Sequence, residues 1–132
     1  MNFGFQRKEL KAIARFSATK DIRTYLNGIC VTQNERGTVI EATNGHMLGR
    51  LLVDNTPKPL ARVIIASVDV DKLKGTKKQA NEWLHFSVNG QKIEVITPDA
   101  TMTFSAVEGF YPDTDRVQPL VYMDSEVKPS HF

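Results

Sequence analysis

The stretch WLHFSVNGQKIEVI, residues 83–96, alternates apolar and polar side chains on both sides of an Asn-Gly pair. Alternation with a period of two is typical of a β-strand that buries one of its faces. Asn89-Gly90 suits a two-residue hairpin turn, because both positions accept the positive φ that such a turn requires. We therefore expect a β-hairpin with an inward and an outward face. The inward set is Leu84, Phe86, Val88, Ile93 and Val95, and the outward set is Trp83, His85 and Ser87.

The elements expected around this hairpin follow an order that occurs twice along the chain. The first half contains a strand over 2–6, a helix over 8–18 and strands over 24–33, 38–43 and 47–53. The second half contains a strand over 62–66, a helix over about 68–74 with Ser67 as its N-cap and Gly75 after its end, and three strands that finish near residue 106. The repeat is one of pattern, not of residue identity. One helix after an edge strand in each half predicts an α+β fold, with two helices packed on one side of two antiparallel sheets.

The composition is that of an ordinary globular domain. The chain has 132 residues, of which 41% are hydrophobic and 24% charged, a length that fits one domain. No apolar run approaches the roughly 18 residues that a membrane span needs, and the N-terminal MNFGFQRKEL lacks the apolar segment of a signal peptide. We therefore expect a cytoplasmic protein without a membrane partner.

No group of residues with catalytic or metal-binding spacing stands out. The three histidines, His46, His85 and His131, belong to no metal or catalytic motif. Cys30 lies in an apolar run, which favours a small buried hydrophobe over a reactive thiol. Asp69 and Asp71 lie at a helix start, where acids more often cap the helix than bind a metal. The sequence therefore predicts no enzyme, no metal site and no cofactor.

A basic stripe on the first expected helix is the first indication of function. Lys8, Lys11 and Arg15 share one helix face. A second group of lysines clusters near the second helix: Lys72, Lys74, Lys77 and Lys78. The ordinary interpretation is a solvated helix face. If both helices share one side of the molecule, however, that side could follow a phosphate backbone without reading bases. The net charge of +2 neither supports nor excludes this use.

Three stretches resemble the bacterial DNA polymerase III beta subunit, the sliding clamp, and most closely its middle domain. They are Phe16-Ser17 followed by DIRTYLNG at 21–28, ATNGHML at 42–48, and VEGFYPDTDRVQP at 107–119. Together they cover about residues 3–119 in the family's order. The resemblance implies one clamp-type domain over 1–119 with a tail over 120–132.

The resemblance also implies partners. Clamp domains join edge to edge into a ring around double-stranded DNA, with basic helices facing the phosphates, so the chain could assemble head to tail as a processivity factor. Tyr25 and Lys20 match family positions near the DNA. The DNA-contacting residues are then expected to be Lys8, Lys11, Arg15, Lys20, Tyr25, Lys72 and Lys74.

In the family, the middle domain forms part of a pocket for short peptides of polymerases and clamp loaders. The matching positions here are Arg23, Leu26, Thr43, Gly45, His46, Leu48, Pro112, Arg116 and Val117. The apolar members of this set would form a slot for an anchoring side chain: Leu26, Leu48, Pro112 and Val117. Its polar rim would be Arg23, His46 and Arg116. The alternative is that the leucines are ordinary core and Gly45 an ordinary turn glycine.

Several positions depart from the family pattern. Asn44 and Met47 replace a family Asp and Arg, Thr24 replaces an aromatic residue, and Asp69 and Asp71 bring negative charge to the expected DNA side. The family's chain has three such domains, and the third completes the peptide pocket; the run Leu120–Met123 could substitute for it. These departures leave a second hypothesis open. The chain could be a stand-alone interaction module of a phage or mobile element, which binds clamp-recognition peptides or a host clamp without encircling DNA.

Overall fold

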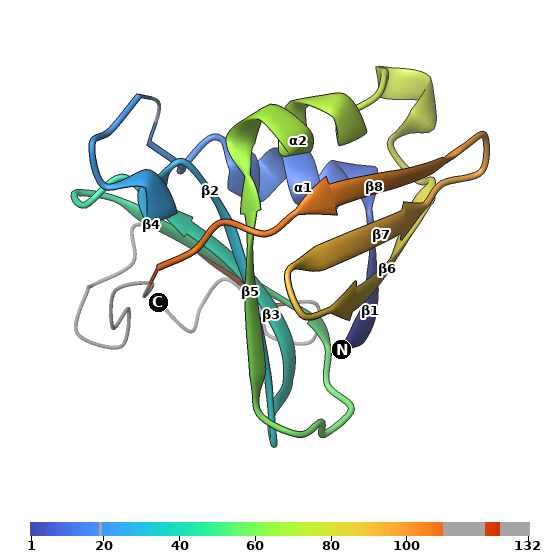
Figure 1. Cartoon of the computed structure of the whole chain (residues 1–132), viewed down its shortest axis with the longest axis horizontal. Helices are drawn as coiled ribbons and strands as arrows, with labels where there is room; N and C mark the ends of the chain where they lie inside the picture. The colour runs from blue at the N-terminus through green and yellow to red at the C-terminus, as the bar shows by residue number, and fades with distance from the viewer. Residues whose placement is uncertain (19, 110–120, 125–132) are drawn as a thin grey trace.

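The structure is a computed structural model that describes residues 1–18, 20–109 and 121–124. Its described elements form two sheets and a helical layer (Figure 1). They are β1 (Asn2–Gln6), α1 (Arg7–Ala14), η1 (Thr24–Leu26), β2 (Gly28–Asn34), β3 (Gly37–Thr43), β4 (Leu48–Asp54), β5 (Ala61–Ala66), α2 (Ser67–Leu73), η2 (Lys77–Gln79), β6 (Trp83–Asn89), β7 (Lys92–Ile96), β8 (Thr101–Ser105) and β9 (Val121–Asp124).

The predicted α+β fold and its duplicated order are confirmed. One sheet has the order β1-β6-β7-β8 and the other β5-β2-β3-β4-β9. The first strand of each half therefore belongs to the sheet of the other half, since β1 pairs with β6 and β5 pairs with β2. Both helices lie on the same side of the two sheets (Figure 1). None of the helices in the described residues is long and apolar enough to cross a membrane.

The hairpin at 83–96 has the predicted register and faces. Asn89 pairs with Lys92 across the Asn-Gly turn. Leu84 and Ile93 are fully buried, whereas Trp83 is exposed. The core between the sheets and the helices includes the stacked rings of Phe3, Phe5 and Phe86, with centroids of Phe86 and each partner 4.8 Å apart. Fully buried residues such as Leu10, Ile13 and Leu73 bring both helices into this core.

The first helix is shorter than predicted. It ends at Ala14 instead of continuing to residue 18, because the next residues turn back on it. The Phe16 and Ser17 amides donate to the carbonyls of Ile13 and Ala14, and the Ser17 hydroxyl also donates to Ala14. The Phe16 ring then lies against Gly49 of β4, where a Cβ would collide with it. A contact with a distant strand thus ends the helix.

Two further boundaries differ from the sequence expectation. Residues 24–26 form a 3-10 turn rather than the start of a strand, because the Asn27 side chain bonds the backbone N–H and C=O of Asp21 and fastens the loop before β2. Ser67 is the first residue of α2, and Ala66 takes the N-cap position. The Ser67 amide donates to the Asn27 carbonyl at 2.8 Å, which draws that residue into the helix. Gly75 follows the end of α2 with φ +65°, as expected for a helix end.

The strand β9 adds a feature that the predicted antiparallel sheets lack. The strands β1 to β8 are antiparallel to their neighbours, as expected. β9 comes from the apolar run of the predicted tail and runs parallel to β4, with Val121 opposite Gly49 and Asp124 opposite Leu52.

A buried arginine joins the two helices. Arg7 is only 5% exposed. Its Nη1 donates to the carbonyl of Leu73, the last residue of α2, at 2.6 Å, and its Nε donates to Glu82 Oε1 at 3.0 Å. A cation favours the C-terminal end of a helix, where carbonyls lack intrahelical partners. Arg7 therefore connects the start of α1 to the end of α2.

We expect the substitution Arg7→Met to lower the free energy of unfolding by about 2–3 kcal/mol, because it keeps much of the buried stem but leaves the Leu73 carbonyl and Glu82 without their charged donor. Urea unfolding followed by circular dichroism measures the change. Lys8→Met is the matched control, since Lys8 is the exposed neighbour on the same helix, and its effect should stay within about 0.5 kcal/mol. Equal effects of the two substitutions would contradict the role of Arg7.

Candidate functional site

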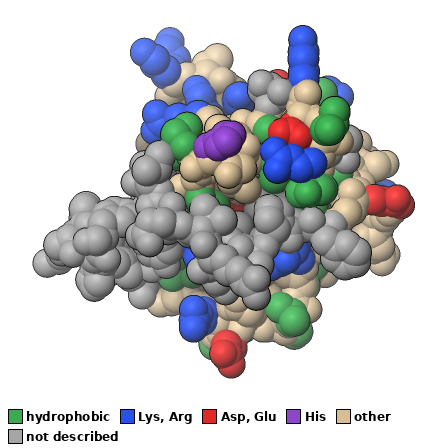
Figure 2. Space-filling model, turned by 90° about the vertical axis from the view of Figure 1, so that its left-hand side faces the viewer, with side chains coloured by type: hydrophobic (Ala, Val, Ile, Leu, Met, Phe, Trp, Pro, Cys, Tyr) green, Lys and Arg blue, Asp and Glu red, His purple; other side chains and the backbone are tan. Residues whose placement is uncertain are grey.

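The helix α1 presents a row of exposed cations on the helical side of the molecule. Lys8, Lys11 and Arg15 are all exposed, and α1 contacts α2. Among the described residues, none of these three side chains has an ion-pair partner. Figure 2 shows one end of the molecule, where Lys and Arg side chains gather toward the top, the side on which the helices lie. We call Lys8, Lys11 and Arg15 the α1 stripe.

The lysines of α2 differ from the α1 stripe because acids of the same segment pair with them. Lys72 Nζ lies 3.9 Å from Asp69 Oδ1, and Lys74 Nζ lies 2.8 Å from Asp71 Oδ1. Burial raises the pKa of the Asp69 carboxyl, an effect that Lys72 partly offsets. The ammonium of Lys72 also lies 5.8 Å from the ring centre of Phe104. The structure thus brings the predicted cations of both helices to one side, and the α1 stripe differs from Lys72 and Lys74 in having no ion-pair partner among the described residues.

The other two predicted DNA residues lie in the segment between α1 and β2. Lys20 is exposed and has a φ of +58°. It borders a cavity of about 470 Å³ together with Ser67, Val68 and Asp71. Tyr25 is half-buried and packs on the small apolar cluster of Cys30 and Ile64. Its packing gives Tyr25 a structural role, and contact of either residue with DNA stays a prediction.

Part of the predicted peptide pocket comes together at η1 and the β3–β4 turn. A Cβ on Gly45 would lie 3.3 Å from Nη2 of Arg23, so the guanidinium lies directly over the turn. Asp21 holds Arg23 through two contacts, at 3.1 Å to Nε and 3.0 Å to Nη2. The hydrogen bonds from the Arg23 side chain lower the pKa of the Asp21 carboxyl. The Arg23 side chain remains half exposed, at 50%, and can still meet a ligand.

The β3–β4 turn is built by its own side chains. The Thr43 hydroxyl donates to the Met47 carbonyl at 2.6 Å and accepts from the Gly45 amide at 3.1 Å. The Asn44 side chain accepts from the amides of His46 and Met47, both at 2.9 Å. Gly45 has a φ of +94°, a conformation that favours glycine. This turn places the exposed His46 at its tip.

The remaining predicted pocket residues do not complete a surface in the described chain. Leu26 and Leu48 are 1% and 0% exposed, so a ligand could touch them only after neighbouring groups move. Pro112, Arg116 and Val117 lie outside the described residues. The pocket therefore stays a prediction, of which Arg23, Gly45 and His46 form the described, accessible part.

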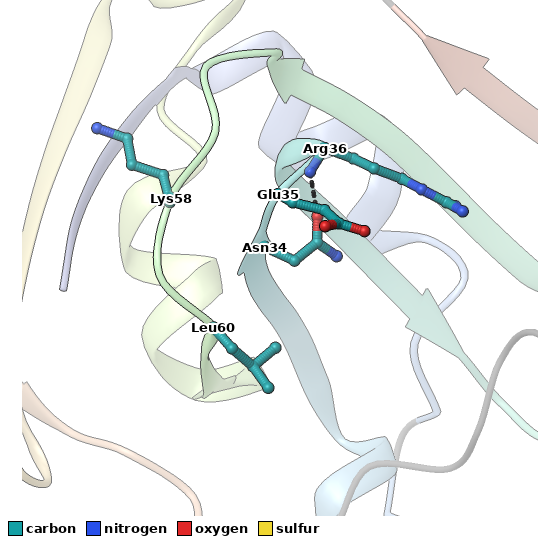
Figure 3. A pocket seen from close by; sticks show the side chains of 5 residues that line it. All are labelled: Asn34, Glu35, Arg36, Lys58 and Leu60. Atoms are coloured by element: carbon teal, nitrogen blue, oxygen red, sulfur yellow. Dashed lines mark hydrogen bonds between the residues drawn. The ribbon is translucent and has the colours of Figure 1, made fainter.

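A further cavity of about 490 Å³ lies between the β2–β3 turn and the loop before β5 (Figure 3). Its lining residues are Asn34, Glu35, Arg36, Lys58 and Leu60. The side-chain oxygen of Asn34 already accepts a hydrogen bond from the Arg36 amide, at 2.8 Å. Arg36 and Lys58 point in different directions (Figure 3), so their charges do not converge on one ligand atom.

The described residues offer little chemistry for catalysis. Cys30 is fully buried, as predicted. Burial, with a smaller contribution from Glu41, raises the pKa of its thiol to about 12. Within the described ranges no group of three His, Cys, Asp or Glu side chains could hold a metal ion.

Comparison with known proteins finds sliding clamps. No family model matches the chain. The beta sliding clamp of Caulobacter vibrioides is 31% identical over 111 residues, which are 77% of this chain and 29% of that protein. That of Buchnera aphidicola subsp. Acyrthosiphon pisum is 30% identical over 111 residues, 81% of this chain and 30% of that protein. The chain thus spans less than a third of the length of these curated relatives.

Solved structures agree in fold. The DNA polymerase III subunit beta of Pseudomonas aeruginosa superposes with a TM-score of 0.73 at 25% identity, over 91% of this chain and 35% of that one. The beta subunit of Thermotoga maritima gives a TM-score of 0.75 at 15% identity, over 91% and 34%, which supports the fold alone. Another Pseudomonas aeruginosa clamp structure, with a TM-score of 0.72 at 25% identity over 90% and 34%, is bound to griselimycin.

We expect the Cys30 thiol to resist iodoacetamide in the native protein at mildly alkaline pH, because it is buried and stays protonated. Intact-mass spectrometry over time measures the modification. At urea concentrations that unfold the protein, the rate of Cys30 modification should rise to that of free glutathione. Fast labelling without urea would show that Cys30 is accessible and contradict its structural role.

Proposed function

The chain is homologous to about one third of the bacterial beta sliding clamp, and we propose on this basis that it is a single-domain clamp-like module that tethers partner proteins to duplex DNA. The sliding-clamp family is non-catalytic, in agreement with the sequence prediction of no enzyme. A module of this size does not surround DNA by itself. We therefore propose that several copies join head to tail into a ring, as a heterologous interface allows when its rotation closes.

The observation that carries the proposal is the α1 stripe. Lys8, Lys11 and Arg15 are exposed cations without an acidic partner among the described residues, on the side shared by both helices. Long basic side chains that meet phosphates give sequence-independent, salt-sensitive contacts. Such contacts let a protein move along the duplex, because they position it without reading bases.

We expect the triple substitution of Lys8, Lys11 and Arg15 by Ala to weaken binding to a duplex by roughly tenfold or more. The slope of the logarithm of the binding constant against that of the salt concentration should fall in magnitude by about 2–3, since each lost phosphate contact contributes about 0.9. Fluorescence anisotropy over a salt series measures both quantities.

The matched control replaces Arg36, Lys58 and Lys92 by Ala. It removes the same charge from sites away from the helices: the β2–β3 turn, the loop before β5, and β7. This control should keep most of the affinity. If both triple variants lose the same affinity and slope, only the overall charge matters and the α1 stripe is not the DNA-facing surface.

A second candidate function is peptide binding without an encircling ring. Two observations favour it. First, Lys72 and Lys74 are paired with acids, which reduces the free positive charge on the helical side. Second, Arg23 lies against the β3–β4 turn, which carries the exposed His46. One related clamp is known with griselimycin bound. We therefore propose that the surface formed by Arg23, Gly45 and His46 takes part in binding clamp-recognition peptides.

We expect His46→Ala to weaken binding of a labelled clamp-recognition peptide by roughly fivefold, or about 1 kcal/mol, because it removes an exposed ring at the proposed rim. His85→Ala is the control, since His85 is an exposed histidine on the other sheet. Fluorescence anisotropy gives the dissociation constants, and the unlabelled peptide serves as the competitor. Unchanged binding in His46→Ala and in Arg23→Ala would remove this surface from the proposal.

A further inference from the structure

The strand β9 covers an edge that the duplicated fold would otherwise leave open. In the eight-strand core, β4 ends one sheet just as β8 ends the other. The backbone of Val121–Asp124 pairs with Gly49–Leu52 and occupies this edge of β4. One of the two equivalent edges is thus filled by the chain's own tail segment.

In the part of the chain that the structure describes, the equivalent edge at β8 has no lysine, proline or bulge that would hinder pairing. Natural edge strands are often blunted by lysine, proline or a bulge. β8 reads Thr-Met-Thr-Phe-Ser, without charge or proline, and its register with β7 is regular over all five residues. Thr101 and Thr103 are exposed, and within the described elements β8 pairs with β7 alone. This edge has the composition of a strand that can accept a partner.

We propose that β9 is a cis-acting cap on β4, which competes with the β8 edge of a second copy and thereby controls head-to-tail assembly. This inference rests on the assembly part of the proposed function. A tethered strand has an effective concentration in the millimolar range, so it outcompetes a free copy at micromolar concentration. The cap is nevertheless displaceable, because it is only four residues long and parallel, the slightly weaker pairing mode.

A double substitution in the full chain, Tyr122→Pro with Met123→Pro, tests the cap. Successive amides of a strand point to opposite sides, so one of the two prolines must remove an N–H that faces β4. The matched control, Tyr122→Thr with Met123→Val, changes the same side chains but keeps both amides and β-favouring residues. Sedimentation velocity over a concentration series measures self-association, and circular dichroism verifies the fold.

We expect the wild type and the Thr/Val control to sediment as monomers at micromolar concentration, whereas the proline variant self-associates at least tenfold more strongly. Adding Thr101→Lys and Thr103→Lys to the proline variant should abolish the gain, because charges protect the β8 edge. A synthetic peptide covering residues 119–126 should also return the proline variant to monomers. Hydrogen exchange at Gly49–Leu52 should be faster in the proline variant wherever it is monomeric.

Three results would overturn the cap: a proline variant that does not self-associate at any concentration, self-association that the β8 lysines do not reduce, or unchanged exchange at β4 under conditions where the proline variant is monomeric. The outcome is separable from that of the proposed function. If the proline variant assembles but does not retain DNA, the cap stands and the clamp-like function fails. If the wild type assembles on DNA while the β4 amides remain protected by β9, the function stands and the cap fails.

Discussion

The bonds that Arg7 makes at the junction of the two helices set the geometry on which the rest of the structure depends. The guanidinium is buried and bonds the last carbonyl of α2 and Glu82, so the two halves meet at a charged group that needs both partners in place. A buried cation without such partners would be strongly destabilising. Because Arg7 begins α1, its position also sets the rotation of that helix. With Leu10 and Ile13 of the same helix also buried, the exposed cations of the α1 stripe face outward.

The exchange of first strands between the halves makes the module one unit. β1 completes the sheet of the second half, and β5 completes that of the first. Each sheet therefore contains strands from both halves. Both helices contribute to the same apolar core, in which Leu10 and Leu73 are fully buried. A disturbance in one half should consequently reach the other. The same duplication produces equivalent edges at β4 and β8, and the difference between them arises outside the repeat, from β9.

Local patterns in the sequence predicted the elements, and distant contacts decided what the patterns missed. The alternation at 83–96 and the Asn-Gly turn needed only neighbouring residues, and the structure confirms them. The end of α1 depends on Phe16 packing against Gly49, and no period in the helix reports that contact. No local pattern indicates the role of Arg7 either, since its partners lie 66 and 75 residues away in sequence. In the candidate site, the Thr-Asn-Gly-His turn was readable from turn chemistry, whereas the burial of Leu26 and Leu48 follows from packing. Pro112, Arg116 and Val117 lie outside the described residues and stay predictions.

The charge distribution links the proposed DNA contact to the proposed assembly. With Lys72 and Lys74 paired to their own acids, the three cations of the α1 stripe are proposed DNA contacts that have no ion-pair partner among the described residues. Three phosphate contacts give weak binding that salt readily removes. Linked copies on one duplex, by contrast, add their contacts at high effective concentration, so retention grows steeply with the number of copies. In the proposed mechanism, a low net charge and a controllable strand edge are therefore complementary. A single copy dissociates from DNA easily, and assembly of several copies keeps them on the duplex.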